Sequence, residues 1–129
     1  MRLLPRLAAA LACLAPALIA GCGDDSGSAP ASRGPNTVVM TDYAYHPRDV
    51  RVRRGQTLKV VNEGGIAHNL TIERGPNPRD ETERLAGTDS FLKGDSAHLR
   101  LDLTPGRYVM VCTVPGHREL GMVGTLSVR

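Results

Sequence analysis

The chain has 129 residues, with 16 Lys or Arg against 13 Asp or Glu, so its formal net charge is only +3. Aromatic residues make up 3% of the sequence, and no stretch concentrates basic residues. This composition argues against a nucleic-acid-binding protein, which needs clustered cations for phosphates and rings for base stacking.

The first 21 residues are typical of an export signal. Arg2 and Arg6 precede an apolar stretch over 7–20, which is shorter than a membrane span. The stretch ends in Leu-Ile-Ala-Gly before Cys22, which resembles the lipobox of bacterial lipoproteins, in which the cysteine thiol receives a diacylglycerol. The alternative is a plain secretory signal that is cleaved elsewhere. We predict a signal peptide at 1–21 and a protein lipid-anchored to the membrane, facing the periplasm or the cell exterior.

A flexible tether and one domain follow the signal. Residues 22–36 comprise the lipidated cysteine and a stretch rich in Gly, Ser, Ala, Pro and Asp without apolar periodicity. Residues 37–129 are the right length for one small domain with a single core. Signal cleavage and lipidation would leave Cys112 as the single free thiol, which excludes an internal disulfide. An inert buried cysteine is one explanation for it, and a metal ligand is another.

The domain is predicted to be all-β. Runs of β-branched, aromatic and alternating residues, separated by Gly and Pro turn signals, predict about seven or eight short strands and a sandwich or barrel. Between 74 and 95 the pattern differs, because Asp80–Glu83 has the form of a capping box and Gly87 could end a short helix near 80–86. The strands are expected at 37–45, 49–53, 56–62, 69–73, 97–103, 107–112 and 122–129.

Two of the four histidines belong to loops that could meet. His98 alternates with the leucines of its strand and is expected to face solvent, and His46 before Pro47 is typical of a surface turn. His68 lies between two predicted strands, and His117 follows Cys112 in another loop. Loops of an antiparallel sandwich gather at its ends, where distant residues can form one site.

A soft metal would suit the side chains in these loops. His68, Cys112 and His117 offer two imidazoles and a thiolate, and Met122 adds a thioether. Two histidines and a cysteine with a weak axial methionine form the blue-copper electron-transfer site. Zinc more often takes tetrahedral sets of thiolates, imidazoles or carboxylates, and rarely a thioether. The ligand types therefore favour copper.

Two segments resemble a known family, the small blue copper proteins or cupredoxins. The segment 62–72, NEGGIAHNLTI, resembles the plastocyanin segment that carries the first histidine. The segment 108–117, YVMVCTVPGH, resembles the cysteine loop of azurin, and the resemblance continues through 121–126. It implies a cupredoxin-like Greek-key β-sandwich and one Cu(I)/Cu(II) ion. The implied copper ligands are His68, Cys112, His117 and Met122.

The resemblance also implies roles for neighbouring residues. Asn69 would tie its loop to the one that contains Thr113, and a backbone N–H would hydrogen-bond the Cys112 sulfur. The edge of His117 would emerge through an apolar patch where partners dock. In this chain the patch would contain Ile66, Pro115 and Leu120, with Arg118 and Glu119 at its rim.

These features indicate one-electron transfer by a protein that is not an enzyme. The protein side chains would fill every ligand position and leave none for a substrate. The expected partners are redox proteins such as a cytochrome or a membrane oxidase or reductase, with the domain a monomer. The alternative is a lipoprotein that delivers copper to a cuproenzyme, although delivery favours exchangeable, Met/His-rich ligands in open loops. A dinuclear copper domain would need a second cysteine near Cys112, and a nitrite reductase would need a second domain.

Overall fold

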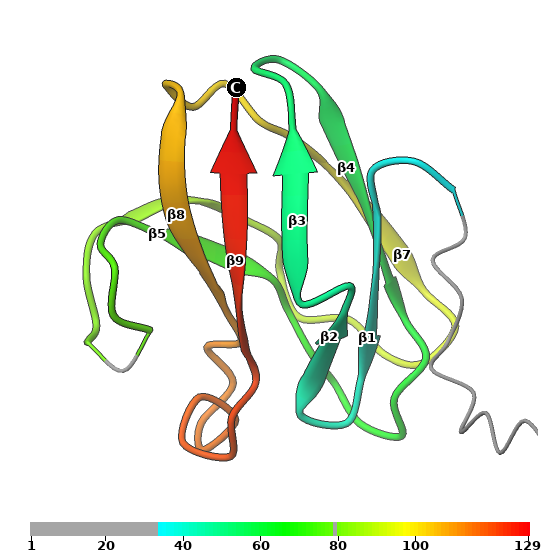
Figure 1. Cartoon of the computed structure of the whole chain (residues 1–129). Coiled ribbons are helices and arrows are strands. Elements are labelled where there is room, and N and C mark those ends of the chain that lie inside the picture. Colours follow the sequence, from blue (N-terminus) through cyan, green and yellow to red (C-terminus); the bar gives the residue numbers. More distant parts are fainter. Residues whose placement is uncertain (1–33, 79) are drawn as a thin grey trace, which may run out of the picture.

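The computed structural model describes residues 34–78 and 80–129, which form nine strands in two sheets (Figure 1). The first sheet has the order β2 (Ala44–His46), β1 (Thr37–Thr41), β4 (Thr57–Asn62) and β7 (Ser96–Arg100). The second has the order β3 (Asp49–Val52), β9 (Val123–Val128), β8 (Gly106–Val111), β5 (Thr71–Glu73) and β6 (Arg84–Gly87). The all-β sandwich predicted from the sequence is confirmed.

Residues 1–33 lie outside this description, and they contain the predicted signal peptide, Cys22 and most of the predicted tether. Within the described residues, no helix is long and apolar enough to cross a membrane.

The core lies between the sheets and is built by alternation along the strands. In β4, Leu58 and Val60 are fully buried and Lys59 between them is exposed, because successive side chains of a strand point to opposite faces. β8 is buried at every position from Tyr108 to Val111, and it lies between β9 and β5 in its sheet. This burial matches the central strand that its continuous apolar run predicted.

Two sequence predictions of secondary structure were wrong. The single strand expected over 37–45 is a hairpin, in which Thr41 pairs with Ala44 and only Asp42 and Tyr43 form the turn. Tyr43 adopts a positive φ of 64° there. The helix expected near 80–86 is absent, because residues 84–87 form β6 and pair antiparallel with β5. Backbone pairing with a sheet edge prevailed over a local capping pattern.

The strand directions bring four connections to one end of the sandwich. β1 runs parallel to β4, and β4 runs antiparallel to β7. β8 runs antiparallel to both β9 and β5. The β1–β2, β4–β5, β6–β7 and β8–β9 connections therefore lie together, at the lower end in Figure 1, opposite the C-terminus.

Candidate metal centre

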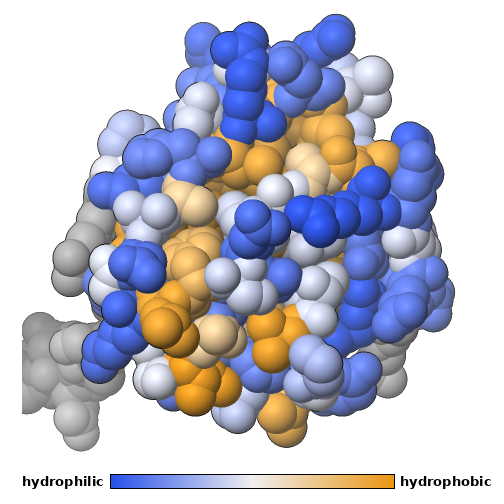
Figure 2. All heavy atoms as spheres, turned by 180° about the vertical axis from the view of Figure 1, so that it is seen from behind, coloured by the Kyte–Doolittle hydropathy of each residue, from blue (hydrophilic) through white to orange (hydrophobic). Residues whose placement is uncertain are grey.

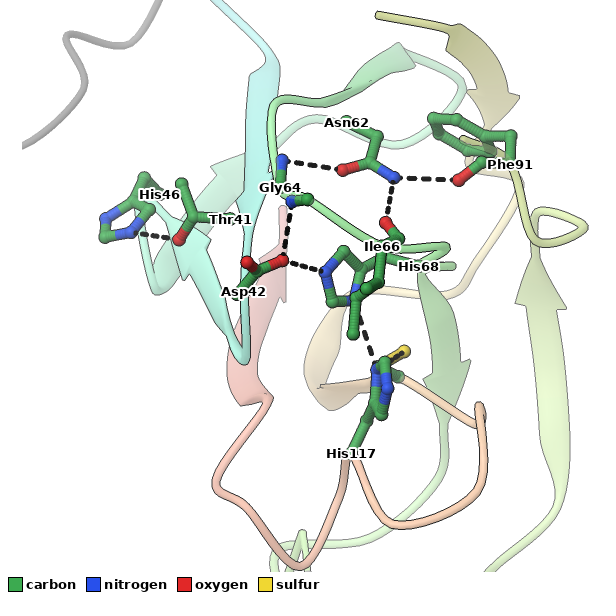
Figure 3. A network of polar contacts seen from close by, with 11 residues as sticks. Thr41, Asp42, His46, Asn62, Gly64, Ile66, His68, Phe91 and His117 are labelled. Carbon is green, nitrogen blue, oxygen red and sulfur yellow. Dashed lines mark hydrogen bonds and ion pairs between the residues drawn. The ribbon is translucent and has the colours of Figure 1, made fainter. Parts of the chain in front are cut away.

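Three potential ligand side chains converge at this end of the sandwich. His68 comes from the β4–β5 connection, Cys112 directly follows β8, and His117 belongs to the β8–β9 connection. The Nδ1 atoms of the two histidines lie 3.1 Å apart, and the Cys112 Sγ lies 3.4 Å from the His117 Nδ1 (Figure 3). All three side chains are buried, and their ligand atoms lie within 4.8 Å of one another. The structure thus brings these three predicted ligands together.

The donor set fits a copper ion. Two nitrogens that bind one metal ion lie about 2 Å from it and so are about 3 Å apart, which is the spacing of the two Nδ1 atoms here. Two imidazoles and one thiolate are the equatorial ligands of a blue-copper site. The Nδ1 atoms of His68 and His117 and the Sγ of Cys112 would hold the ion.

Burial shifts the pKa of Cys112 and of His117 in the metal-free protein. It raises the pKa of the Cys112 thiol, while backbone N–H groups of Asn69 and Val114 hydrogen-bond the sulfur and act in the opposite direction. Burial also lowers the pKa of His117, and the neighbouring His68 lowers it further. His117 therefore favours the neutral imidazole, whose lone pair can bind a metal.

Met122 is held next to two of these residues by its backbone. Its N–H donates to the His117 carbonyl at 3.0 Å, and its carbonyl accepts from the Cys112 N–H at 3.1 Å. The Met122 side chain is fully buried in the same hydrophobic cluster as Cys112. The fourth predicted ligand thus lies in the core, beside the ends of the loop that carries His117.

Asn69 and Thr113 connect the two ligand segments. The Asn69 side-chain amide donates to the Thr113 hydroxyl, and its oxygen accepts from the Thr113 backbone N–H, both at 2.8 Å. Tyr45, buried on β2, donates its hydroxyl hydrogen to the Asn69 carbonyl at 2.8 Å. The structure therefore places Asn69 between the segments that follow His68 and Cys112.

The surface near the site is apolar, and most of His117 is covered. His117 keeps 7% of its surface exposed, whereas His68 keeps none. The Tyr43 ring meets the His117 ring edge-on, with centroids 5.1 Å apart. Ile66 and Leu120 are among the exposed large hydrophobic residues. Figure 2 shows apolar side chains at the lower end of the molecule and also in its upper half.

The expected polar rim is only partly present. Glu119 is exposed, but Arg118 turns inward and its Nη2 lies 2.6 Å from the Glu73 Oε1. The Nη1 of Arg118 also donates to the carbonyls of Pro78 and Asp80. Arg118 therefore ties the β8–β9 connection to the chain after β5, because its guanidinium finds a carboxylate and two carbonyls there.

Asp42, which comes from the β1–β2 turn, was not among the site residues predicted from the sequence. Its Oδ1 lies 3.0 Å from the His68 Nε2 and accepts the Gly65 backbone N–H at 2.8 Å. The hydrogen bond with His68 is the main cause that lowers the pKa of Asp42 below its ordinary value. Aspartate is depleted in strands and favoured in turns, so its position inside an apparent strand was a usable signal.

The remaining two histidines lie away from the cluster. His46, at the end of β2, has its Nε2 3.1 Å from the Thr41 hydroxyl. His98 is exposed on β7, as its alternation with leucines predicted.

Comparison with known proteins identifies the family. Residues 34–129 match the copper binding proteins of the plastocyanin/azurin family. The copper-resistant cuproprotein CopI of Rubrivivax gelatinosus is 26% identical over 120 residues, which cover 83% of this chain and 73% of that protein. Auracyanin-B of Chloroflexus aurantiacus is 32% identical over 102 residues, which cover 72% of this chain but only 42% of that protein.

A solved structure agrees with both the sequence match and the fold. The reduced auracyanin of Roseiflexus castenholzii has a TM-score of 0.61 and 25% identity, over 72% of this chain and 94% of that chain. Copper is the ion that the matched family binds. This chain therefore belongs to the plastocyanin/azurin family of copper-binding proteins.

Proposed function

We propose that the protein carries single electrons through one copper ion held by His68, Cys112, His117 and Met122. The observation that supports this proposal is the buried convergence of two imidazoles and one thiol from separate connections of a β-sandwich. Copper bound there would alternate between Cu(II) and Cu(I), accepting and releasing one electron. The proposed role is a carrier of electrons without substrate turnover, and not that of an enzyme.

The residues around the site favour electron transfer because they hold the ligands in place. Asn69 and Thr113 fix the segments behind His68 and Cys112 to each other. The backbone hydrogen bonds of Met122 fix the loop that carries His117. A ligand set that keeps one geometry in both oxidation states needs little rearrangement when the electron arrives or leaves.

Copper delivery is the second candidate function. It is favoured by the relative named as a copper-resistant cuproprotein, whose alignment covers most of this chain. Against it, His68 and Cys112 are fully buried, so a copper acceptor has no direct access to their ligand atoms. The two functions differ in a transfer assay. A carrier of electrons keeps its copper when mixed with a Cu(I) chelator of moderate affinity, whereas a delivery protein releases copper rapidly.

A visible absorption spectrum of the copper-loaded protein tests the proposed site. An intense thiolate-to-copper band is expected, together with a reversible one-electron couple in voltammetry. Cys112→Ser should abolish the band, because a hydroxyl cannot supply the thiolate. Cys22→Ser is the matched control, since it changes a cysteine outside the domain and should leave the band unchanged. A colourless Cu(II) complex of the unmodified protein would contradict the proposal.

We further propose that Cys22 carries a lipid anchor and that residues 22–36 tether the domain to an extracytoplasmic membrane face. The support is the sequence alone: a predicted signal of 21 residues, with an apolar stretch over 7–20, ends directly before a cysteine. Cys22→Ser should then move the protein from the membrane fraction to the soluble fraction, since stable anchoring needs two acyl chains or more. Membrane association that persists in this variant would contradict lipid anchoring.

The proposed partners are redox proteins, such as a cytochrome or a membrane oxidase or reductase, and the domain acts as a monomer. Exposed Ile66 and Leu120, in the connections that carry His68 and His117, support docking at this end, where His117 keeps 7% of its surface exposed. Replacing Leu120 by Lys should slow electron exchange with the cellular partner in stopped-flow measurements without altering the absorption spectrum. Unchanged exchange would place docking elsewhere.

A further inference from the structure

The β1–β2 turn contributes a carboxylate to the candidate metal centre. In Figure 3, His68 lies between Asp42 on one side and His117 on the other. Its Nε2 is 3.0 Å from the Asp42 Oδ1, and its Nδ1 is 3.1 Å from the His117 Nδ1. One nitrogen of the ring therefore faces the carboxylate and the other faces the remaining ligands.

Two adjacent glycines make room for this contact. A Cβ at Gly64 would lie 2.5 Å from the Asp42 Oδ1 and 2.8 Å from the His68 Nε2. Real Cβ atoms do not approach other atoms so closely, so a larger residue at 64 must displace one of the two side chains. Gly65 contributes its backbone N–H, which donates to the same Asp42 oxygen at 2.8 Å. The pair Gly64–Gly65 holds the carboxylate against the imidazole.

We propose that Asp42 is a positioning residue for the metal ligand His68. An ionised carboxylate accepts hydrogen bonds and donates none, so the hydrogen between the two groups resides on the His68 Nε2. The Nδ1 of the same ring then keeps its lone pair, directed toward His117 and Cys112. The contact also fixes the plane of the ring, whose side chain is fully buried. Carboxylates that bind the outer N–H of a metal-ligating histidine act in this way.

The charge of Asp42 has a second consequence, which rests on the proposed electron-transfer function. A carboxylate hydrogen-bonded to an imidazole makes it a stronger donor and places negative charge near the metal. Cu(II) carries more positive charge than Cu(I), so Asp42 stabilises the oxidised ion more. Asp42 thereby lowers the reduction potential of the site.

A purely structural role for Asp42 makes different predictions. Asp42 would then hold only the turn, through its hydrogen bond with the Gly65 N–H. Its removal would lower the stability of the fold without changing the tautomer of His68 or the potential of the copper. The test must therefore measure these two properties separately from folding.

The first experiment compares Asp42→Asn and Asp42→Ala with Asp102→Asn. Asp102 follows β7 at the opposite end of the sandwich and pairs with Arg100 at the surface, so it controls for lost charge. In the metal-free protein, ¹⁵N NMR should show Nε2–H as the main tautomer of His68, and this preference should decline in both Asp42 variants. A mixed or Nδ1–H tautomer in the unmodified protein, or an unchanged tautomer in Asp42→Ala, would overturn the proposal.

Metal binding and potential are measured on the same variants. Loss of a hydrogen-bond partner of a metal-ligating histidine typically lowers metal affinity about 10–100-fold, and we expect this for Cu(II) and for Zn(II) as a redox-inactive probe. If Cu(II) affinity falls about tenfold more than Cu(I) affinity, the reduction potential rises by about 59 mV. Asp102→Asn should change neither quantity. Unchanged Zn(II) affinity and potential in both folded Asp42 variants would overturn the proposal.

Gly64→Ala provides a test that leaves Asp42 in the chain. Its methyl group must separate Asp42 from His68, so the potential should rise and Zn(II) affinity should fall in the same direction as in Asp42→Ala. The matched control is Gly106→Ala, because a Cβ at 106 meets no atom closer than 3.7 Å. A Gly64→Ala protein with the properties of the unmodified chain would contradict the proposed contact.

These readouts separate the inference from the proposed function. If the unmodified protein shows the thiolate band but the Asp42 variants match it in tautomer, Zn(II) affinity and potential, only the role of Asp42 is wrong. If the unmodified protein shows no thiolate band, the proposed electron carrier is wrong. The tautomer and the Zn(II) affinity still decide whether Asp42 positions His68.

Discussion

Asn69 and Thr113 are joined by two hydrogen bonds of 2.8 Å across 44 positions of sequence. Each directly follows a residue of the candidate metal centre, His68 and Cys112. The Asn69 side-chain amide therefore links the segment before β5 to the segment after β8, beyond the last backbone pair of these two strands. The distance between the imidazole and the thiol depends on this link, because both residues are anchored beside it.

Asn69→Ala should destabilise the metal-free domain by about 1–3 kcal/mol, because it leaves the partly buried Thr113 N–H without its acceptor. Thr113→Val is the graded comparison. It removes only the hydroxyl and keeps the backbone hydrogen bond, so its loss should be smaller. Urea unfolding followed by circular dichroism measures both. A loss in Thr113→Val equal to or above that in Asn69→Ala would contradict the role assigned to the amide.

The ion pair between Arg118 and Glu73 predicts strong coupling between two other segments. Their side chains are only 10% and 6% exposed, so removing one partner leaves the other charge buried. Arg118→Met should therefore lower the free energy of unfolding by about 3–5 kcal/mol. The double variant with Glu73→Gln should lose less than the sum of the single variants. A double-mutant cycle by chemical denaturation measures this coupling, and additive losses would show that the pair contributes nothing.

Local patterns in the sequence were enough to predict most strands and the ligand types. Strict alternation located β7, and the continuous apolar run located β8, because both patterns follow directly from burial in a sheet. The convergence of His68, Cys112 and His117 depends on the fold, and the sequence indicated it through the expected gathering of loops at one end of a sandwich and through resemblance to a family. The spacing between Cys112 and His117 is local, whereas His68 lies 49 positions from His117.

The features that sequence analysis missed depend on contacts between distant segments. Asp42 is predicted to lie in a strand over 37–45, and only the pairing of Thr41 with Ala44 shows that it lies in a turn. Arg118 is predicted to be a surface residue in a loop, and only the structure shows its ion pair with Glu73. The predicted helix near 80–86 failed for the same reason, since the partner of that segment is β5. The secondary-structure propensity of a short segment does not depend on residues far away in the sequence, so it cannot predict these contacts.

Tyr45 predicts how stability depends on pH in the alkaline range. Burial is the main cause that raises the pKa of Tyr45 well above 10 in the folded protein. An acid whose pKa is raised on folding stabilises the protein below the pKa of the unfolded state, and this stability is lost as pH rises above it. Unfolding free energy should therefore fall above about pH 10, by up to about 1.4 kcal/mol per pH unit.

Denaturant titrations of the copper-loaded protein between pH 8 and 11 measure this slope, with the Cys112 thiol held as a metal-bound thiolate. Tyr45→Phe should flatten the slope and cost about 1 kcal/mol at neutral pH, where its hydrogen bond with the Asn69 carbonyl is lost. Tyr43→Phe is the control, since this side chain is 38% exposed, and it should keep the slope. Equal slopes in Tyr45→Phe and the unmodified protein would contradict the assignment.

Met122 should affect the reduction potential of the copper more than the affinity for the ion. An axial thioether binds weakly at long distance, and its identity shifts the potential. Met122→Leu should keep the thiolate band and raise the potential, because it removes an axial electron donor, and electron donation stabilises the more positive Cu(II) more than Cu(I). Met122→Gln should lower the potential, because a harder oxygen ligand favours Cu(II). Voltammetry and absorption measure both effects, and loss of copper from both variants would identify Met122 as a principal ligand.

The last prediction concerns His117, whose ring is the part of the site nearest to solvent. It keeps 7% of its surface exposed, and the ring of Tyr43 meets it edge-on with the ring centroids 5.1 Å apart. His117→Gly should leave a gap at the metal that added imidazole can fill. The thiolate band, weakened or shifted in the variant, should then return as imidazole is titrated in.

Because the Tyr43 ring packs against the His117 ring, we expect Tyr43 to slow the entry of imidazole. Tyr43→Gly suits the positive φ of 64° at this position and removes the ring, so it should open the gap without straining the turn. Imidazole should therefore restore the band faster in the Tyr43→Gly, His117→Gly protein than in His117→Gly alone. Stopped-flow absorption measures both rates. If a folded, copper-binding His117→Gly protein shows no rescue with or without Tyr43, then His117 does not occupy the solvent-facing position and electrons must enter the site by another route.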